Sequence, residues 1–389
     1  MGNILFFSSD DWDSGLKTSK YHMSTRLARD NKVLFVNSLG LRRPNVSSKD
    51  IKRVLAKISK FRKGIQHISE NLYVISPLLL PFHGNRLVEK INRTLVSIQI
   101  RMAMDLLKMD FYDIWTFHPI TATLLDSFRS RMLIYYCVDR MDCFVGVPSD
   151  KIRHYDKILT KKADLVFCVS KAILHEKLLL GGNAKYTPHG VDHALYSGSL
   201  KFTDLPEDIA EIPKPIIGFW GLISRDWIDY DLVAKLAQKY PKVSLVFLGR
   251  IDDSLDSIPN FRNIHYLGPK AYHDLPRYGR GFDVAIIPFV KTPLTRHSNP
   301  LKALEYIASG IPVVTVDIPE LSRLSEKIQI AKNGDDFIRM CGEALSMKSD
   351  DYSIRLSKSV LEEDWDSVYM KLIAEIERTY KEKQVLHVL

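Results

Sequence analysis

The chain has 389 residues, of which 46% are hydrophobic and 26% are charged, and its formal net charge is +9 at pH 7. This length is too great for one comfortable core, so two domains are expected, and the composition is that of an ordinary soluble globular protein. The excess of basic residues indicates an anionic partner.

The sequence lacks the marks of several other protein classes. No apolar run approaches the roughly 18–20 residues that span a bilayer, and the apolar run 3–7 lacks the flanks of a signal peptide. No Walker motif and no Gly-x-Gly-x-x-Gly fingerprint occurs, which argues against a P-loop nucleotidase or an ordinary dehydrogenase. The four cysteines have no metal-ligand spacing and are expected to be buried thiols in a reducing cytosol: Cys137, Cys143, Cys168 and Cys341.

The first half of the chain alternates strand-like and helix-like segments, which indicates an α/β fold. Apolar strands are expected at these ranges: 3–7, 32–37, 72–76, 113–117, 132–138 and 163–170. A long amphipathic helix is expected from about 85 to 109. The polar loop after the first strand contains Asp13 and Gly15. A metal site at Asp11 and Asp13 is disfavoured, because no further ligand lies nearby in the sequence.

Segment 41–64 has the most unusual composition in the chain, with nine basic residues against the single acid Asp50. Apolar residues recur in it at helical spacing, so a basic helix could lie in the headgroup layer of an anionic membrane. The basic residues expected to contact headgroups are Lys52, Arg53, Lys57 and Lys60. The same pattern fits a helix that packs its apolar stripe on the protein, and both interpretations stay open. With one aromatic residue, Phe61, and no nucleic-acid motif, nucleic-acid binding is not expected.

Two strands of the first half are followed by candidate catalytic residues. His118 follows the strand 113–117, and Asp139 follows the strand 132–138. The carboxyl ends of parallel strands are the usual place for site chemistry in this architecture. Asp139 could be a general base for an attacking hydroxyl group, or it could cap the next turn. His118 precedes a proline and could equally be a hydrogen-bonded loop residue.

Helical and strand periodicity is lost between 199 and 213, which indicates an interdomain linker. A new series of strands then begins at 214–221, and Arg225 follows it. Further strands are expected at 243–249 and 264–268, and each of these ranges, like the first, ends in glycine.

The stretch 281–321 contains the most informative pattern. A buried strand at 284–289 is followed by a polar loop, and a helix begins near Pro300 and ends near Gly310. Lys302 lies in the first turn of this helix. Free backbone N–H groups at a helix N-terminus, beside the carboxyl edge of a parallel sheet, form an anion site that suits phosphates.

These residues resemble the nucleotide-sugar-binding motif of GT-B glycosyltransferases, especially the bacterial family 4, or group 1, enzymes. The matching residues are Pro288-Phe289, Pro300-Leu-Lys302-Ala-Leu-Glu305-Tyr306 and Gly310-Ile-Pro312-Val-Val. Weaker matches, at Pro188-His189-Gly190-Val191-Asp192 and in the terminal helix 363–380, extend the resemblance over the whole chain. The resemblance implies two Rossmann-like domains that face each other across a cleft. The implied boundaries are 1–198 for an acceptor domain, with 367–389 crossing back to it, 199–213 for the linker and 214–366 for a nucleotide-sugar domain.

The resemblance also implies site roles. Glu305 would bind the ribose hydroxyls. The residues expected to face the diphosphate or the base are Asn299, Pro300, Leu301, Lys302, Gly221, Arg225 and Gly268. His297 and Ser298 would face the transferred sugar, although His297 stands where the family often has a glutamate. Gly15 and Asp13 would lie in the loop that lines the cleft.

The implied activity is the transfer of a sugar from a nucleotide diphosphate sugar, with UDP expected from family frequency, without a metal or other cofactor. The basic segment suggests a lipid-linked saccharide acceptor at the inner face of the bacterial cytoplasmic membrane, in surface polysaccharide synthesis. A UDP-sugar 2-epimerase-like isomerase and a non-catalytic sugar-nucleotide-binding protein are the alternatives. Retention is usual in the family, whereas a base at Asp139 would fit inversion, so the stereochemistry stays open.

Overall fold

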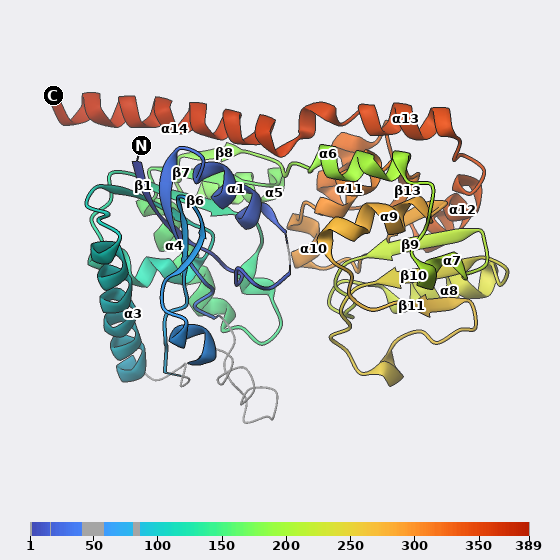
Figure 1. Ribbon diagram of the computed structural model, residues 1–389, viewed down its shortest axis with the longest axis horizontal. Helices are drawn as coiled ribbons and strands as arrows, with labels where there is room; N and C mark the ends of the chain where they lie inside the picture. The colour runs from blue at the N-terminus through green and yellow to red at the C-terminus, as the bar shows by residue number, and fades with distance from the viewer. Residues whose placement is uncertain (1, 16, 41–57, 81–85, 389) are drawn as a thin grey trace. The chain divides into compact units, whose positions relative to one another are not determined.

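The computed structural model describes residues 2–15, 17–40, 58–80 and 86–388. The chain forms two compact units (Figure 1). The first unit contains residues 1–188 and 369–389, and the second contains residues 189–368. The second unit therefore includes segment 199–213, which the sequence suggested as a linker.

The first unit is built on an eight-stranded sheet in the order β3-β4-β2-β1-β5-β6-β7-β8. Every neighbouring pair is parallel except β3 and β4, which are antiparallel. The strands are β1 (Gly2–Phe7), β2 (Asn31–Val36), β3 (Gln66–Ser69), β4 (Leu72–Ile75), β5 (Tyr112–Thr116), β6 (Leu133–Cys137), β7 (Leu165–Cys168) and β8 (Ala184–Tyr186). The strands expected from continuous apolar runs are present, because such runs suit a sheet that is covered on both faces.

Helices of the first unit connect these parallel strands. They are α1 (Ser19–Leu27), α3 (Arg86–Leu106), α4 (Ser149–Lys162), α5 (Lys171–Leu179) and the short 3₁₀ turns η1 (Pro119–Thr123), η2 (Leu125–Ser127) and η3 (Met141–Cys143). The terminal helix α14 (Trp365–Val388) begins in the second unit and passes to the first at Tyr369. In the first unit, the Lys383 ammonium binds the Asp164 carboxylate at 2.8 Å.

The second unit contains a six-stranded, fully parallel sheet in the order β11-β10-β9-β12-β13-β14. Its strands are β9 (Ile216–Trp220), β10 (Ser244–Leu248), β11 (Ile264–Tyr266), β12 (Val284–Ile287), β13 (Val313–Val316) and β14 (Gln329–Ala331). All residues of β9, β10, β12 and β13 are buried, which agrees with a sheet that has helices on both faces.

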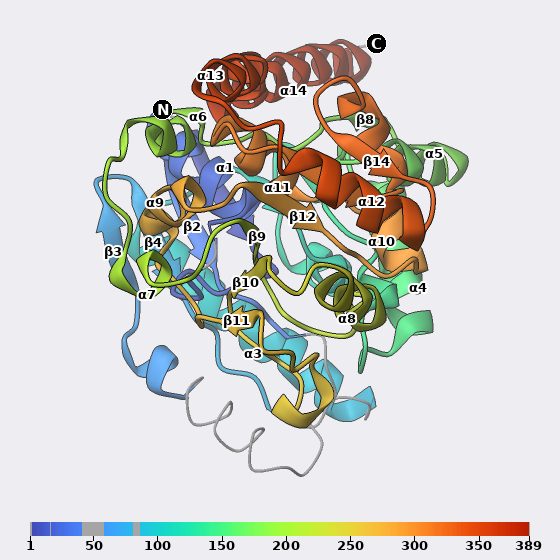
Figure 2. The ribbon, with the colours of Figure 1, turned by 90° about the vertical axis from the view of Figure 1, so that its right-hand side faces the viewer.

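Helices cover both faces of this second sheet. They are α6 (His193–Tyr196), α7 (Glu207–Ala210), α8 (Tyr230–Lys239), α9 (Leu275–Arg280), α10 (Pro293–His297), α11 (Leu301–Ala308), α12 (Gly334–Ala344) and α13 (Asp350–Lys358), with the 3₁₀ turns η4 (Ser197–Lys201), η5 (Leu255–Ser257), η6 (Tyr272–Asp274), η7 (Pro319–Leu324) and η8 (Leu361–Glu363). Figure 2 shows α8 and α12 on one side of the sheet and α9 and α11 on the other. The α10 helix was not expected from the sequence, which had suggested a polar loop before α11.

Candidate functional site

Three neighbouring strands of the second unit end in glycines with positive φ angles, which L-residues rarely adopt. Gly221, Gly249 and Gly268 follow β9, β10 and β11, with φ angles of 139°, 150° and 70°. The Gly249 N–H donates to the Gly268 carbonyl at 2.9 Å, and the Gly221 N–H donates to the Leu248 carbonyl at 2.9 Å. A Cβ atom on Gly249 would lie 1.7 Å from the Gly221 carbonyl oxygen. The carboxyl edge of these strands is therefore a surface of bare backbone, open to a close-lying ligand.

Lys302 lies against this surface. Its ammonium nitrogen is 5.3 Å from the ring centroid of Phe219 and 4.8 Å from that of Phe289. A Cβ atom on Gly221 would lie 3.1 Å from the Lys302 Cε, so only glycine leaves room for the lysine side chain here. Burial lowers the pKa of Lys302 from 10.5 to about 8, and Glu305 opposes this shift. Among the described residues, no carboxylate lies within ion-pair distance of this ammonium group.

The N-terminus of α11 adds backbone donors beside Lys302. Pro300 occupies the N-cap position without a side-chain cap, and the first turn contains no acidic residue. The first N–H groups of a helix have no partner within the helix, so this end attracts anions. Ser298 and Asn299 are buried just before the helix, and the Ser298 hydroxyl donates to the Thr295 carbonyl at 2.8 Å.

Glu305 lies one turn along α11 and is held by aromatic residues. The Trp220 indole N–H donates to the Glu305 carboxylate at 2.8 Å, and the Tyr196 ring stacks on Trp220 with ring centroids 5.9 Å apart. The Tyr306 hydroxyl accepts the Trp220 backbone N–H at 2.9 Å. Burial raises the pKa of Glu305, while Trp220, Lys302 and Tyr196 oppose the rise. The Glu305 carboxylate is thus fixed at the end of β9, where it can accept hydrogen bonds from the hydroxyl groups of a ligand.

These strand ends belong to a recognised domain. Residues 214–346 match the sequence model of a family described as "Glycosyl transferases group 1". The chain carries a glycosyl transferases group 1 domain. The family expected from the sequence is thereby confirmed, and the domain includes Lys302, Glu305 and the three glycine strand ends.

Similar proteins and solved structures support this domain assignment. A Bacillus subtilis (strain 168) protein named for a teichuronic acid biosynthesis glycosyltransferase is 23% identical over 282 residues, covering 67% of this chain and 70% of that protein. Sucrose-phosphate synthase from Thermosynechococcus elongatus has a TM-score of 0.69 at 11% identity and covers 98% of this chain and 100% of its own. Anabaena HepE, solved in complex with UDP, has a TM-score of 0.65 at 13% identity, over 97% and 100% of the two chains. The predicted GT-B fold is confirmed.

Two other residues expected at the nucleotide-sugar site, Arg225 and His297, contact neighbouring residues of the same domain. The Arg225 guanidinium donates to the Ser257 carbonyl at 3.0 Å and lies over the Tyr230 ring. In α10, the His297 Nδ1 lies 2.6 Å from the Pro293 carbonyl oxygen. Neither contact involves Lys302 or Glu305, so the roles suggested for Arg225 and His297 stay predictions.

In the first unit, Asp139 follows β6 and has charged neighbours from another part of the sequence. Burial raises the pKa of Asp139 from 3.8 to about 6, with Lys20 opposing the rise and Asp10 adding to it. Lys20 and Asp10 form an ion pair at 3.1 Å. A carboxyl group with this pKa is ionised near neutral pH and can accept a proton.

His118 is buried directly after β5. Its Nδ1 accepts the Ile120 backbone N–H at 3.2 Å and so caps η1. The structure thus gives His118 a capping role, whereas its catalytic role stays a prediction.

The loop after β1 is tied to the basic segment. The Lys60 ammonium binds the Asp11 carboxylate at 2.7 Å and the Asp13 carboxylate at 2.5 Å. Gly15 has a φ of 77° and open space around it. Lys52, Arg53 and Lys57, which were also expected to contact a membrane, lie outside the described residues.

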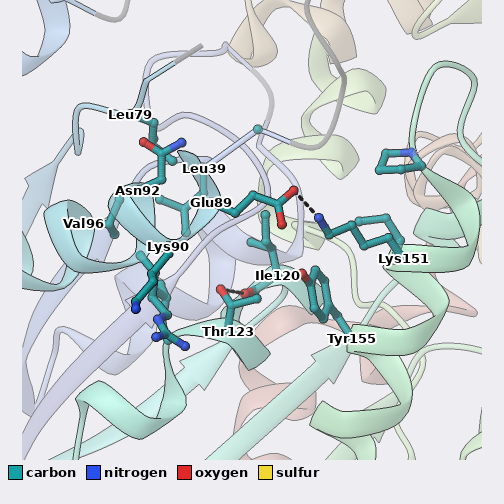
Figure 3. Close-up of a pocket in the computed structure, with 15 residues that line it drawn as sticks. Leu39, Leu79, Glu89, Lys90, Asn92, Val96, Ile120, Thr123, Lys151 and Tyr155 are labelled. Atoms are coloured by element: carbon teal, nitrogen blue, oxygen red, sulfur yellow. Dashed lines mark hydrogen bonds and ion pairs between the residues drawn. The ribbon is translucent and has the colours of Figure 1, made fainter. Parts of the chain in front are cut away.

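The first unit also contains a pocket of about 380 Å³ between α3 and α4 (Figure 3). It lies beyond the carboxyl ends of β2, β4 and β5, and apolar side chains dominate its lining: Leu39, Leu79, Val96, Ile120, Leu124 and Ile152. Figure 3 shows the ion pair of Glu89 with Lys151 at this pocket, and Lys90 also lines it. Such a pocket suits a ligand with an apolar part and a polar or anionic end.

The described residues contain neither a membrane-spanning helix nor a metal-binding cluster. No helix in that part of the chain is long and apolar enough to cross a bilayer. No group of three or more His, Cys, Asp or Glu side chains there is arranged to hold a metal ion.

Several site residues were not predicted. Trp220 donates a hydrogen bond to Glu305, and Tyr196 stacks on Trp220. Phe219 and Phe289 flank the Lys302 ammonium, and Gly249 lies at the carboxyl end of β10. Gly249 could have been predicted, because three of the expected strand ranges end in glycine. No sequence signal could have found Tyr196, because it lies more than one hundred residues from Glu305 in the chain.

Proposed function

We propose that this chain transfers a sugar from a nucleotide diphosphate sugar, with UDP as its nucleotide, to a hydroxyl group of a lipid-linked saccharide. The observation that carries this proposal is the site around Lys302. Its ammonium group lies against the glycine surface in the first turn of α11, and no described carboxylate pairs with it. A diphosphate would supply the missing negative charge, and Glu305 lies where ribose hydroxyls could bind.

In the proposed reaction, an acceptor hydroxyl oxygen attacks the anomeric carbon of the donor sugar. A carbon–oxygen bond forms while the bond between the anomeric carbon and the diphosphate oxygen breaks, and its electron pair leaves with the nucleoside diphosphate. Asp139 accepts the hydroxyl proton. Lys302 and the α11 N-terminus stabilise the charge that grows on the leaving group, a role that does not require a metal ion.

A lipid-linked acceptor is supported by the first unit and by one relative. The pocket between α3 and α4 is largely apolar with basic residues in its lining, which suits the junction of a lipid and a phosphate-linked saccharide. The similar Bacillus subtilis protein is named for teichuronic acid biosynthesis. We propose that the enzyme works on the cytoplasmic membrane surface during polysaccharide synthesis.

The test is an assay of the purified chain with UDP-, GDP- and ADP-sugars and a polyprenyl diphosphate-linked saccharide. We expect release of one nucleoside diphosphate together with a glycosylated product, both measured by mass spectrometry. The rate should fall as the pH drops below about 6, because Asp139 then holds a proton and cannot accept another. Asp139→Asn should abolish this transfer and keep nucleotide binding, whereas Lys302→Gln should weaken nucleotide binding itself.

Other outcomes would refute the proposal. Epimerisation of a free nucleotide sugar without an acceptor would indicate an isomerase instead. Nucleotide binding with no turnover, across all donors and acceptors, would indicate a binding protein.

A further inference from the structure

The outer face of α3 is apolar, which is the reverse of an ordinary surface helix. Large hydrophobic side chains recur along this face with exposed fractions from 43% to 75%: Leu87, Ile91, Ile98, Met102 and Leu106. Their spacing places them in one stripe along the helix, about 28 Å long at 1.5 Å per residue. A surface helix normally presents charged and polar residues on its solvent side.

The opposite face of α3 is the one that anchors the helix to the first unit. Val96, Ile100 and Ala103 are almost fully buried on that side. The exposed stripe is therefore not needed to hold α3 in place, and Figure 1 shows α3 at the edge of the first unit. Exposed apolar stripes of this length mark interaction surfaces in soluble proteins.

Basic residues flank the stripe on one side. Lys90, Arg93 and Arg101 are exposed, and none of them forms an ion pair with a carboxylate among the described residues. Of the two acids in α3, Glu89 is paired with Lys151, and Asp105 lies near the C-terminal end of the helix. Arg101 donates to the Ser127 carbonyl at 3.2 Å, whereas Lys90 and Arg93 have no carboxylate partner among the described residues. A stripe of bulky apolar residues with exposed cations beside it matches the interface of an anionic bilayer, where apolar groups enter the acyl boundary and cations meet phosphate headgroups.

We propose that α3 is a membrane-docking helix that lies in the headgroup layer of an anionic bilayer. This inference deepens the proposed function and rests on it, because a transferase with a lipid-linked acceptor must reach a bilayer. The pocket between α3 and α4 shares Lys90 and Arg93 with the basic flank, so docking through α3 brings the pocket mouth close to the lipid surface.

The experiment is co-sedimentation of the full chain with vesicles of phosphatidylcholine alone or mixed with phosphatidylglycerol. We expect binding to the mixed vesicles that weakens with salt. A triple variant, Ile91→Gln with Ile98→Gln and Met102→Gln, should bind these vesicles at least about tenfold more weakly, since the loss of apolar insertion removes part of the binding energy. The matched control carries Leu179→Gln, Leu361→Gln and Met370→Gln, which change apolar residues elsewhere that are on average more exposed, and should bind like the unmodified chain.

Two further measurements separate this inference from the proposed function. Melting shifts with UDP should be the same in the α3 variant and the unmodified chain, which also shows that the variant is folded. Lys302→Gln should lose the UDP shift and keep vesicle binding. Vesicle binding without any transfer activity would refute the proposed function and support membrane docking. Transfer in detergent without vesicle binding would support the proposed function and refute membrane docking.

Docking through α3 is overturned if the unmodified chain does not bind the mixed vesicles, or if the α3 variant binds them as well as its control does. A second copy of the chain is the competing occupant of the stripe. It would be revealed by light scattering if the unmodified chain were a dimer and the α3 variant a monomer with unchanged vesicle binding.

Discussion

At the scale of single residues, Lys302 shows how a partly buried cation prepares an anion site. Its ammonium group is surrounded by two aromatic rings and backbone, and this burial lowers its pKa to about 8. A lysine in this state is partly neutral under mildly alkaline conditions. A bound diphosphate would favour the charged form, so ligand binding and protonation should be coupled.

We therefore expect the affinity for UDP to fall as the pH rises above about 8. Below that pH the lysine is already protonated, and above it binding must take up a proton, which costs up to about tenfold in affinity per pH unit. Calorimetric titration across this window measures the effect.

Lys302→Arg is the control, because arginine stays charged throughout and the titration of UDP itself cancels in the comparison. If both proteins gave parallel pH profiles, the proposed coupling would be absent. Lys302→Gln should weaken UDP binding by about 10- to 150-fold, since a hydrogen bond to a charged group contributes roughly 1.5–3 kcal/mol.

At the same scale, site residues could be predicted from the sequence where their position depends only on the local course of the chain. Lys302 and Glu305 follow from a helix start and its turn spacing, and the structure places both beside the carboxyl ends of the strands. The partner of Glu305 could not be predicted, because Trp220, with Tyr196 stacked on it, reaches Glu305 only through tertiary packing. Likewise, Lys20 and Asp10, which form an ion pair with each other, lie near Asp139 in the structure. Both are more than one hundred residues from Asp139 in the chain.

At the scale of elements, the ends of β9 and β10 are packed too closely for any side chain between them. Gly249→Ala would place a Cβ atom 1.7 Å from the Gly221 carbonyl oxygen. Relief of this clash requires a backbone shift, on top of the cost of a φ of 150°. We expect a loss of more than about 2 kcal/mol of unfolding free energy, measured by urea denaturation.

Gly268→Ala is the matched variant at the end of β11. Its φ is 70°, but no heavy atom lies within 4 Å of the added Cβ atom. It should lose only about 1 kcal/mol, the conformational cost of a left-handed alanine. Equal losses in the two variants would mean that close packing at Gly249 does not matter.

The elements themselves were largely predictable, because buried parallel strands appear as continuous apolar runs. The exceptions have physical reasons. The short, exposed β3 lacks such a run, since only antiparallel pairing with β4 defines it. The α10 helix has five residues and is held by a capping box at Thr292 and Thr295, a signal too local for hydrophobic periodicity to detect.

At the scale of the whole molecule, the first unit is discontinuous in sequence. Tyr369–Leu389 belongs to it, although the second unit intervenes. Leu372 is almost fully buried, and Lys383 is paired with Asp164. The terminal helix is therefore attached to the first unit by a buried side chain and an ion pair.

Deletion of residues 369–389 should destabilise the first unit and spare the second. We expect two separate melting transitions in calorimetry, with UDP shifting only the one that belongs to the second unit. A shorter deletion of 386–389 leaves Lys383 in place and should melt like the full chain. Loss of the UDP-dependent transition in the longer deletion would show that the second unit also depends on the terminal helix.

The same discontinuity sets the order in which a ribosome can complete this protein. The second unit is one continuous segment and can close as soon as it has emerged, whereas the unit synthesised first must wait for the last residues of the chain. The 201 residues between Pro188 and Leu389 take about 10–40 s at typical elongation rates. During that interval an eight-stranded sheet lacks its final helix, so nascent chains of this protein should depend on chaperones through their N-terminal half rather than through the half synthesised last.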